Sequence, residues 1–180
     1  MCTILSIISM LLFRFKRWGG GVSLYVHQHN HFYTLIEFTC MCDDFEMVAI
    51  VCRNFVILVL YHPPRAVLSN FLDYVEKLLH RTNANNWHVI IVRDFIVNLL
   101  SDSQAKFQLL EVILANNCDN LIHQPTSVIG HCDTLIDFCL TSVPKAETCS
   151  GVLATDISAH LSVLEIFPTH NSLKKKKKIV

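Results

Sequence analysis

The chain has 180 residues, of which 52% are hydrophobic and 17% charged, a composition that excludes an intrinsically disordered protein and fits one globular domain. The formal net charge is zero, but a third of the Lys and Arg residues lie in one run, Lys174–Lys178. Without that run, 10 basic side chains remain against 15 acidic ones, so the body carries a net charge of −5. Proteins that bind DNA tightly usually present a basic face, so this composition argues against tight DNA binding.

The N-terminal segment is mostly apolar from Met1 to Phe13 and is followed by Arg14, Lys16 and Arg17. It has the length of a signal-peptide core and is too short to span a bilayer. No basic residue precedes it and no small-x-small cleavage site follows it, which argues against secretion. We therefore expect no membrane association, and we interpret the segment as a buried strand or as sequence from outside the original reading frame.

Three strands are predicted in the first third of the chain. Val22–His27 follows three glycines and alternates apolar and polar residues, which is typical of a half-buried strand. Phe45–Cys52 and Phe55–Tyr61 are apolar and rich in β-branched residues, and their short separation predicts a hairpin. The prolines at positions 63 and 64 end the second strand of that hairpin, because proline cannot donate to a strand ladder.

Helices and strands alternate in the rest of the chain. Apolar residues recur at helical spacing from Leu68 to Leu79, and Asn83–Asn86 ends that helix. Val89–Val92 is a continuous apolar run, typical of a strand covered on both faces, and a second helix is predicted over Asp102–Asn117. The mixture predicts an α/β or α+β fold with its sheet buried under helices. Two further strands are expected, at Thr134–Leu140 and Ser162–Phe167.

Four short segments with polar residues lie at the ends of predicted strands, where open α/β sheets place their functional sites. Each segment alone is weak evidence, because an Asp after an apolar strand is also a common turn former. The segments are Tyr61-His62-Pro63-Pro64, Arg93-Asp94-Phe95-Ile96-Val97-Asn98, Thr134-Leu135-Ile136-Asp137 and Thr155-Asp156-Ile157-Ser158-Ala159-His160-Leu161.

In this order and spacing the segments resemble the endonuclease/exonuclease/phosphatase superfamily, in particular the endonuclease domain of jockey- and CR1-like non-LTR retrotransposons. That branch typically reads Tyr-Arg-Pro-Pro, Gly-Asp-Phe-Asn-Ile-Asn, Thr-Leu-Ile-Asp and Ser-Asp-His-Leu-Pro. Gln124-Pro125-Thr126 and Gly130-His131 extend the resemblance, which runs from Gly19 to Phe167. It implies a partial α/β sandwich over residues 19–167 with its N-terminal part missing, a segment 1–18 of unclear origin and a disordered Lys-rich tail over 168–180.

The resemblance also implies a mechanism, in which Mg²⁺ polarises the scissile phosphate and an Asp activates the attacking water. Asp94 matches that Asp, and Tyr61 matches a phosphate contact. Asp137 and His160 match a pair in which the carboxylate fixes the tautomer of the imidazole and favours its charged form. The implied partner is DNA, the implied location is the nucleus, and a reverse transcriptase domain would belong to a longer polyprotein. The implied substrate-binding residues are His62, Asn98 and His131.

The chain departs from the family pattern on the metal side of the site. Ile96 stands in place of an Asn, and its side chain offers no oxygen ligand. Ala159 stands in place of an Asp, Arg93 replaces a Gly, and residues 1–18 contain no Asn, Asp or Glu to supply the first two ligands. Loss of one electrostatic group costs roughly 10²–10³ in rate, so we expect a catalytically inactive copy. The alternative is a non-catalytic, transposon-derived remnant or interaction module.

Other features have competing interpretations. His27, His29 and His31 alternate along the sequence, so on a strand they would share one face. They could hold zinc there or lie on a solvated face, and we favour the second interpretation. The eight cysteines form no CxxC pair, which favours buried free thiols over a disulfide framework. His131, Cys132 and Asp133 are interpreted as a loop rather than a site. The lysine run is either a nuclear-targeting or nucleic-acid-contacting tail or the translation of an A-rich tract, which we favour.

Overall fold

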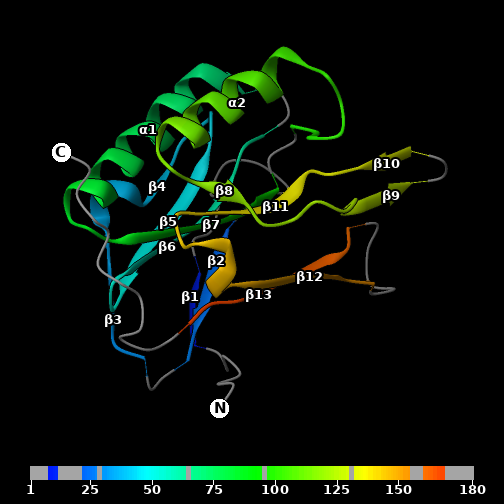
Figure 1. Ribbon diagram of the computed structural model, residues 1–180. Coiled ribbons are helices and arrows are strands. Elements are labelled where there is room, and N and C mark those ends of the chain that lie inside the picture. The colour runs from blue at the N-terminus through cyan, green and yellow to red at the C-terminus, as the bar shows by residue number, and fades with distance from the viewer. Residues whose placement is uncertain are drawn as a thin grey trace.

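The computed structural model describes residues 8–11, 22–27, 30–63, 66–94, 97–129, 132–154 and 160–168. Two helices lie on one face of a seven-stranded mixed sheet, and two small antiparallel ribbons lie on the other (Figure 1). The helices are α1 (Leu68–Ala84) and α2 (Gln104–Ala115). No helix in these ranges is both long and apolar enough to cross a membrane.

The central sheet has the strand order β3-β5-β6-β7-β11-β8, with β4 also paired to β5. Neighbouring strands in this order are antiparallel except for β6 and β7, which are parallel and are connected through α1. The bounds are β3 Phe32–Thr34, β4 Cys40–Met41, β5 Glu46–Cys52, β6 Phe55–Tyr61, β7 His88–Asp94, β8 Asp119–Asn120 and β11 Asp137–Thr141.

The β5–β6 hairpin forms at the predicted position. Arg53 adopts a positive φ of 59°, which lets the chain reverse within two residues. The resulting register pairs Cys52 with Phe55 and continues to Glu46 with Tyr61. Both strands are largely buried because β5 and β6 are inner strands of the sheet, which explains their almost continuous apolar sequence.

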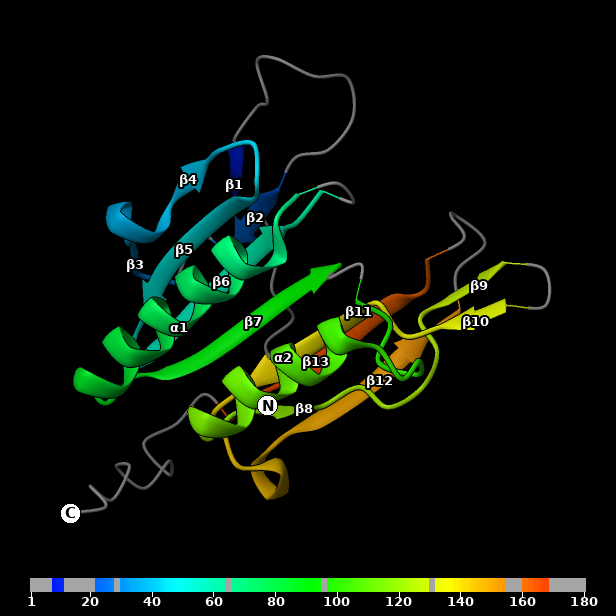
Figure 2. The same ribbon diagram turned by 90° about the horizontal axis from the view of Figure 1, so that it is seen from above.

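The hydrophobic core lies between the sheet and the helices. The apolar stripe of α1 includes Phe71, Val75 and Leu78, each at most 1% exposed, and packs on the sheet face that carries Leu58. α2 begins at an N-cap, Ser103, whose hydroxyl accepts a hydrogen bond from the N–H of Lys106. Together the two helices cover one face of the sheet, as the sequence predicted (Figure 2).

The opposite face carries two separate ribbons. β1 (Ile8–Leu11) pairs with β2 (Ser23–Val26), and β12 (Cys149–Leu153) pairs with β13 (Ser162–Ile166). Another antiparallel pair, the hairpin of β9 (Ser127–Ile129) and β10 (Cys132–Thr134), extends away from the body (Figures 1 and 2). Two short 3₁₀ helices, Ile36–Phe38 and Lys145–Glu147, complete the described elements.

Two expectations from the sequence are wrong. The single strand predicted over Thr134–Leu140 is two strands, because the ladder breaks at Leu135 and Ile136 between β10 and β11. His27 and His31 do not lie on one strand, since β2 ends at residue 26 and β3 begins at residue 32, and His29 lies outside the described residues.

The described cysteines are all free, as expected, but only Cys118 and Cys139 are buried. Cys42, Cys132 and Cys149 are exposed, which corrects the expectation of buried thiols. Short edge strands and loops account for this difference, because their side chains alternate or turn towards solvent. The Lys-rich tail was predicted over residues 168–180, and all of it except residue 168 lies outside the described residues.

Candidate functional site

Four strands of the central sheet place polar residues in one row across the sheet. Glu46 of β5 pairs with Tyr61 of β6, Tyr61 pairs with Asp94 of β7, and Asp94 pairs with Asp137 of β11. Directly paired residues in a sheet project their side chains to the same face. The row lies where the parallel strands β6 and β7 end, so three sequence-predicted residues meet at the edge expected for a site. Of Asp94 the structure describes the backbone alone.

Asp137 and His160 form the predicted pair. The Oδ2 of Asp137 is 2.8 Å from the Nδ1 of His160, with the carboxylate side chain 19% exposed and the imidazole 42% exposed. An ionised carboxylate can only accept, so the Nδ1–H of His160 donates to Asp137. Only the charged imidazole, protonated on both ring nitrogens, can donate from Nε2–H to a phosphate oxygen, because the neutral tautomer with its proton on Nδ1 leaves Nε2 as an acceptor.

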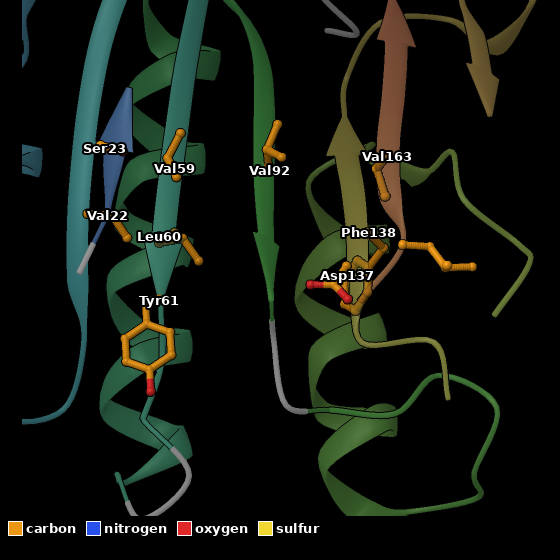
Figure 3. A pocket seen from close by; sticks show the side chains of 10 residues that line it. Val22, Ser23, Val59, Leu60, Tyr61, Val92, Asp137, Phe138 and Val163 are labelled. Carbon is orange, nitrogen blue, oxygen red and sulfur yellow. The ribbon is translucent and has the colours of Figure 1, made fainter. Parts of the chain in front are cut away.

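A cavity of about 400 Å³ lies beside this row, on the ribbon-bearing face of the sheet. Tyr61 of β6 and Asp137 of β11 lie at one end of it, and Val59 of β6 and Val92 of β7 lie further from that end (Figure 3). Val22, directly before β2, and Val163 of β13 form its sides. The cavity is therefore apolar along most of its length, with polar groups at the strand ends.

The other predicted substrate-binding residues have different surroundings. His62 is 6% exposed, and its ring lies 5.2 Å from the ring of Phe71 on α1, so it faces the helix side of the sheet. The Oδ1 of Asn98 accepts hydrogen bonds from the N–H groups of Leu100 and Leu135, each at 3.0 Å. These contacts favour a packing role for His62 and a loop-bracing role for Asn98. His131, Ile96 and Ala159 lie outside the described residues.

The described side chains do not fit a divalent metal site. Within the described ranges, no group of three or more His, Cys, Asp or Glu residues lies close enough to hold a metal ion. Glu46 and Asp137 are separated by three strand spacings, about 14 Å, so one ion cannot bridge their carboxylates. Mg²⁺ therefore has no ligand set among these residues.

Glu46 is the residue of the row that the sequence interpretation missed. It is fully buried and directly beside Tyr61. The available signal was a single acidic residue at the start of an otherwise apolar strand, because a buried carboxylate needs a compensating partner. Without the strand register, however, nothing connected Glu46 to the row.

A second buried carboxyl group lies on the ribbon-bearing face. Glu165 of β13 has both carboxyl oxygens buried, with no hydrogen-bond partner among the described residues. Burial raises the pKa of Glu165 to about 7. Burial, and then the charge of Glu165, also raise the pKa of the Cys139 thiol on β11 well above its ordinary value.

Solved structures with a similar fold include several nucleases, whereas no protein-family model and no curated protein matches the sequence. The endonuclease domain of TRAS1, a telomere-specific non-LTR retrotransposon, has 10% identity and a TM-score of 0.68, over 89% of this chain and 80% of that one. An endonuclease/exonuclease/phosphatase family protein from Leptotrichia buccalis C-1013-b has 14% identity and a TM-score of 0.56, over 92% and 73%.

An AP endonuclease from Archaeoglobus fulgidus is similar at 13% identity and a TM-score of 0.58, over 82% of this chain and 74% of that one. At such low identities the agreement concerns the fold, and it confirms the α/β fold that the resemblance implied. The chain thus has the α/β fold of the endonuclease/exonuclease/phosphatase proteins.

Proposed function

We propose that this chain is a degenerate DNA endonuclease of the non-LTR retrotransposon type, which can contact a DNA phosphate but does not hydrolyse it. The observation that carries this proposal is the Asp137–His160 pair at the same sheet edge as Tyr61. The nuclease folds of the similar structures are consistent with a nucleic acid as the ligand.

The phosphate side of the site would act through two side chains. His160 is held by Asp137 through Nδ1, and in its charged form it would donate from Nε2–H to a phosphate oxygen. The hydroxyl of Tyr61 is a second donor at the same end of the cavity. Both contacts involve the phosphodiester backbone, so they predict DNA binding without base specificity.

The metal side of the site is where hydrolysis would fail. Ile96 and Ala159 supply no oxygen ligand, and the described carboxylates do not converge on one point. Each electrostatic group removed from such a site costs roughly 10²–10³ in rate. We therefore propose that Mg²⁺, the cofactor implied by the resemblance, is not held tightly enough to support cleavage.

A nicking assay on supercoiled plasmid with Mg²⁺ or Mn²⁺ tests the proposal. We expect no nicked product above the buffer control, together with weak, salt-sensitive binding of the same DNA in a filter or anisotropy assay. Asp94→Ala is the control, because it removes the residue that matches the water-activating Asp. Robust nicking that disappears in Asp94→Ala would overturn the proposed inactivity.

A second candidate is a remnant with no nucleic-acid-binding role, which the net charge of −5 on the body favours. Calorimetric titration with a short duplex separates the two candidates, since the remnant would not bind it, whereas neither candidate is expected to bind Mg²⁺ tightly. The genomic sequence on both sides of the reading frame would test the proposed reverse transcriptase partner. Mixed AAG and AAA codons for Lys174–Lys178 would argue against an A-rich tract as the origin of that run.

A further inference from the structure

Thr126 is a fully buried residue with hydrogen bonds to the backbone on both sides of the Asp137–His160 pair. Its Oγ1 accepts from the N–H of Asp137 at 2.9 Å and from the N–H of Ile136 at 3.3 Å. Its carbonyl accepts from the N–H of Leu161, the residue directly after His160, at 2.7 Å. One residue is thus bonded to the chain at Asp137 and next to His160.

Two more backbone contacts extend this connection. The N–H of Thr126 donates to the carbonyl of Thr134 at 2.8 Å, at the base of the β9–β10 hairpin. Ser127, the next residue, forms an isolated antiparallel bridge with His160. The segment at Thr126 therefore lies between the start of β11 and the chain at His160, and is bonded to both.

The sheet ladders do not provide this connection. β11, which carries Asp137, pairs with β7 and β8, whereas β13, which follows His160, pairs with β12. Among the described strands, no ladder joins β11 to β13, so the relative position of the two side chains depends on contacts outside the ladders. Thr126 makes such contacts to both partners.

We propose that Thr126 is a positioning residue, which sets the separation between the Asp137 carboxylate and the His160 imidazole and thereby fixes the imidazole tautomer. The proposal deepens the proposed function, because it concerns the same phosphate-contacting pair. Its test does not depend on DNA binding or cleavage, so failure of the proposed function and failure of this inference are distinguishable.

The variants that test it are Thr126→Val, which removes the hydroxyl, and Thr126→Ser, which keeps it. Thr141→Val is the matched control, because Thr141 lies on the same strand as Asp137, is 1% exposed, and also uses its hydroxyl in backbone hydrogen bonds. Its Oγ1 donates to the carbonyl of Val89 at 2.7 Å and accepts from the N–H of Val143 at 3.1 Å. A purely structural effect should appear in both valine variants.

The measurement is the tautomer of His160 from two-bond ¹H–¹⁵N spectra of histidine-labelled protein at pH 8.5, assigned with His160→Gln. We expect one tautomer with the proton on Nδ1 in the wild type, in Thr126→Ser and in Thr141→Val. In Thr126→Val we expect the nitrogen shifts to move to those of a mixed, solvent-like tautomer population. Unchanged His160 shifts in a folded Thr126→Val protein, with a loss of thermal stability equal to that of Thr141→Val, would overturn the proposal.

A measurement on the wild type covers the case in which Thr126→Val does not fold. On warming below the global transition, the amides of Asp137 and Leu161 should lose protection from hydrogen exchange together with the loss of the fixed His160 tautomer. The amide of Val143, bonded to Thr141, serves as the reference within the same molecule. A fixed tautomer that persists after the Asp137 and Leu161 amides exchange would contradict the inference.

Discussion

Asp137 and His160 are 23 residues apart in the chain, yet the Oδ2 of Asp137 lies 2.8 Å from the Nδ1 of His160. Asp137→Asn keeps the shape of this side chain but removes the negative charge that favours the charged imidazole, the form that can donate from Nε2–H to a phosphate oxygen. We expect the affinity for a short DNA duplex to fall about fivefold, which corresponds to about 1 kcal/mol for one charge-assisted hydrogen bond that is partly exposed. Fluorescence anisotropy at low salt would measure this change.

The control for Asp137→Asn is Asp133→Asn, which removes the same charge from an exposed position on β10. Because removal of a negative charge near DNA favours binding by itself, this control should bind slightly more tightly than the wild type. Equal affinities for the two variants would show that the pair makes no contribution to DNA binding.

The bracing role of Asn98 leads to a prediction about stability. Asn98→Ala leaves the N–H of Leu135, a residue that is 3% exposed, without its acceptor, and should lower the free energy of unfolding by about 1–2 kcal/mol. Asn98→Asp keeps an acceptor oxygen and should restore most of that loss. Urea unfolding would measure both effects. A loss of DNA binding in Asn98→Ala without loss of stability would instead support the substrate-binding role implied by the resemblance.

Glu165 predicts a pH dependence of stability. Its pKa is about 7 in the folded protein and near 4.5 in the unfolded chain, so the folded state holds the proton more strongly. Stability from this group is therefore fully present below about pH 4.5, falls as the pH rises through the window to about 7, and is constant above it. Glu165→Gln should remove this fall and raise the Tm at pH 8 by about 2–4 °C, corresponding to about 1 kcal/mol after allowance for solvent screening.

Thermal melts of both proteins at pH 4.5, 6 and 8 would check this prediction. The result depends on the difference between the two proteins rather than on either curve, because other groups also titrate in this range. Parallel pH profiles for the wild type and Glu165→Gln would show that the carboxyl group of Glu165 is solvated in solution.

Ile91 and Val92 are neighbours on β7 and test whether the two faces of the central sheet differ in burial. Ile91 is fully buried on the helix side, whereas Val92 is 37% exposed on the cavity side. Ile91→Ala should lower the free energy of unfolding by about 2–5 kcal/mol, and Val92→Ala by less than about 1 kcal/mol. Denaturant titration of the two variants would measure the difference. Similar losses at both positions would mean that the cavity side is covered in solution by more of the chain than the ribbons.

The sequence correctly predicted those elements whose position depends only on their own residues. β6 lies at its predicted bounds because a continuous apolar run, rich in β-branched residues, is bounded by a tight turn and by prolines. α1 has its predicted apolar stripe, although it continues to Ala84 before the asparagines end it. These features are local, so periodicity and turn chemistry are sufficient to locate them.

The remaining elements depend on partners that are distant in the chain. The break between β10 and β11 arises where the Thr126 hydroxyl accepts from the N–H groups of Ile136 and Asp137, and no pattern near residue 135 reveals that contact. β8 has only two residues and exists through its pairing with β11. Short strands of this kind carry too few residues for a period-2 signal.

The candidate site likewise contains residues that the motifs identified and residues whose contacts depend on distant parts of the chain. The motifs identified Tyr61, Asp94, Asp137 and His160, and the structure brings the backbone or side chains of all four to one sheet edge. Glu46 was missed because its membership in the row depends on the register of a hairpin. His62 and Asn98 were assigned from motif position alone. The ring of His62 lies beside Phe71, which no motif includes, and Asn98 bonds to the backbone of Leu135, in a motif 37 residues further along the chain.

The row across the sheet has a consequence for the order of folding. Glu46, Tyr61 and Asp94 all lie within the contiguous unit β5–β6–α1–β7, whose contacts are close in sequence, so this unit should form early and can do so while the chain is still being synthesised. Asp137 joins the row only when β11 has paired with β7, and His160 follows still later. The Asp137–His160 pair is therefore assembled last, onto an edge that the first half of the chain has already aligned.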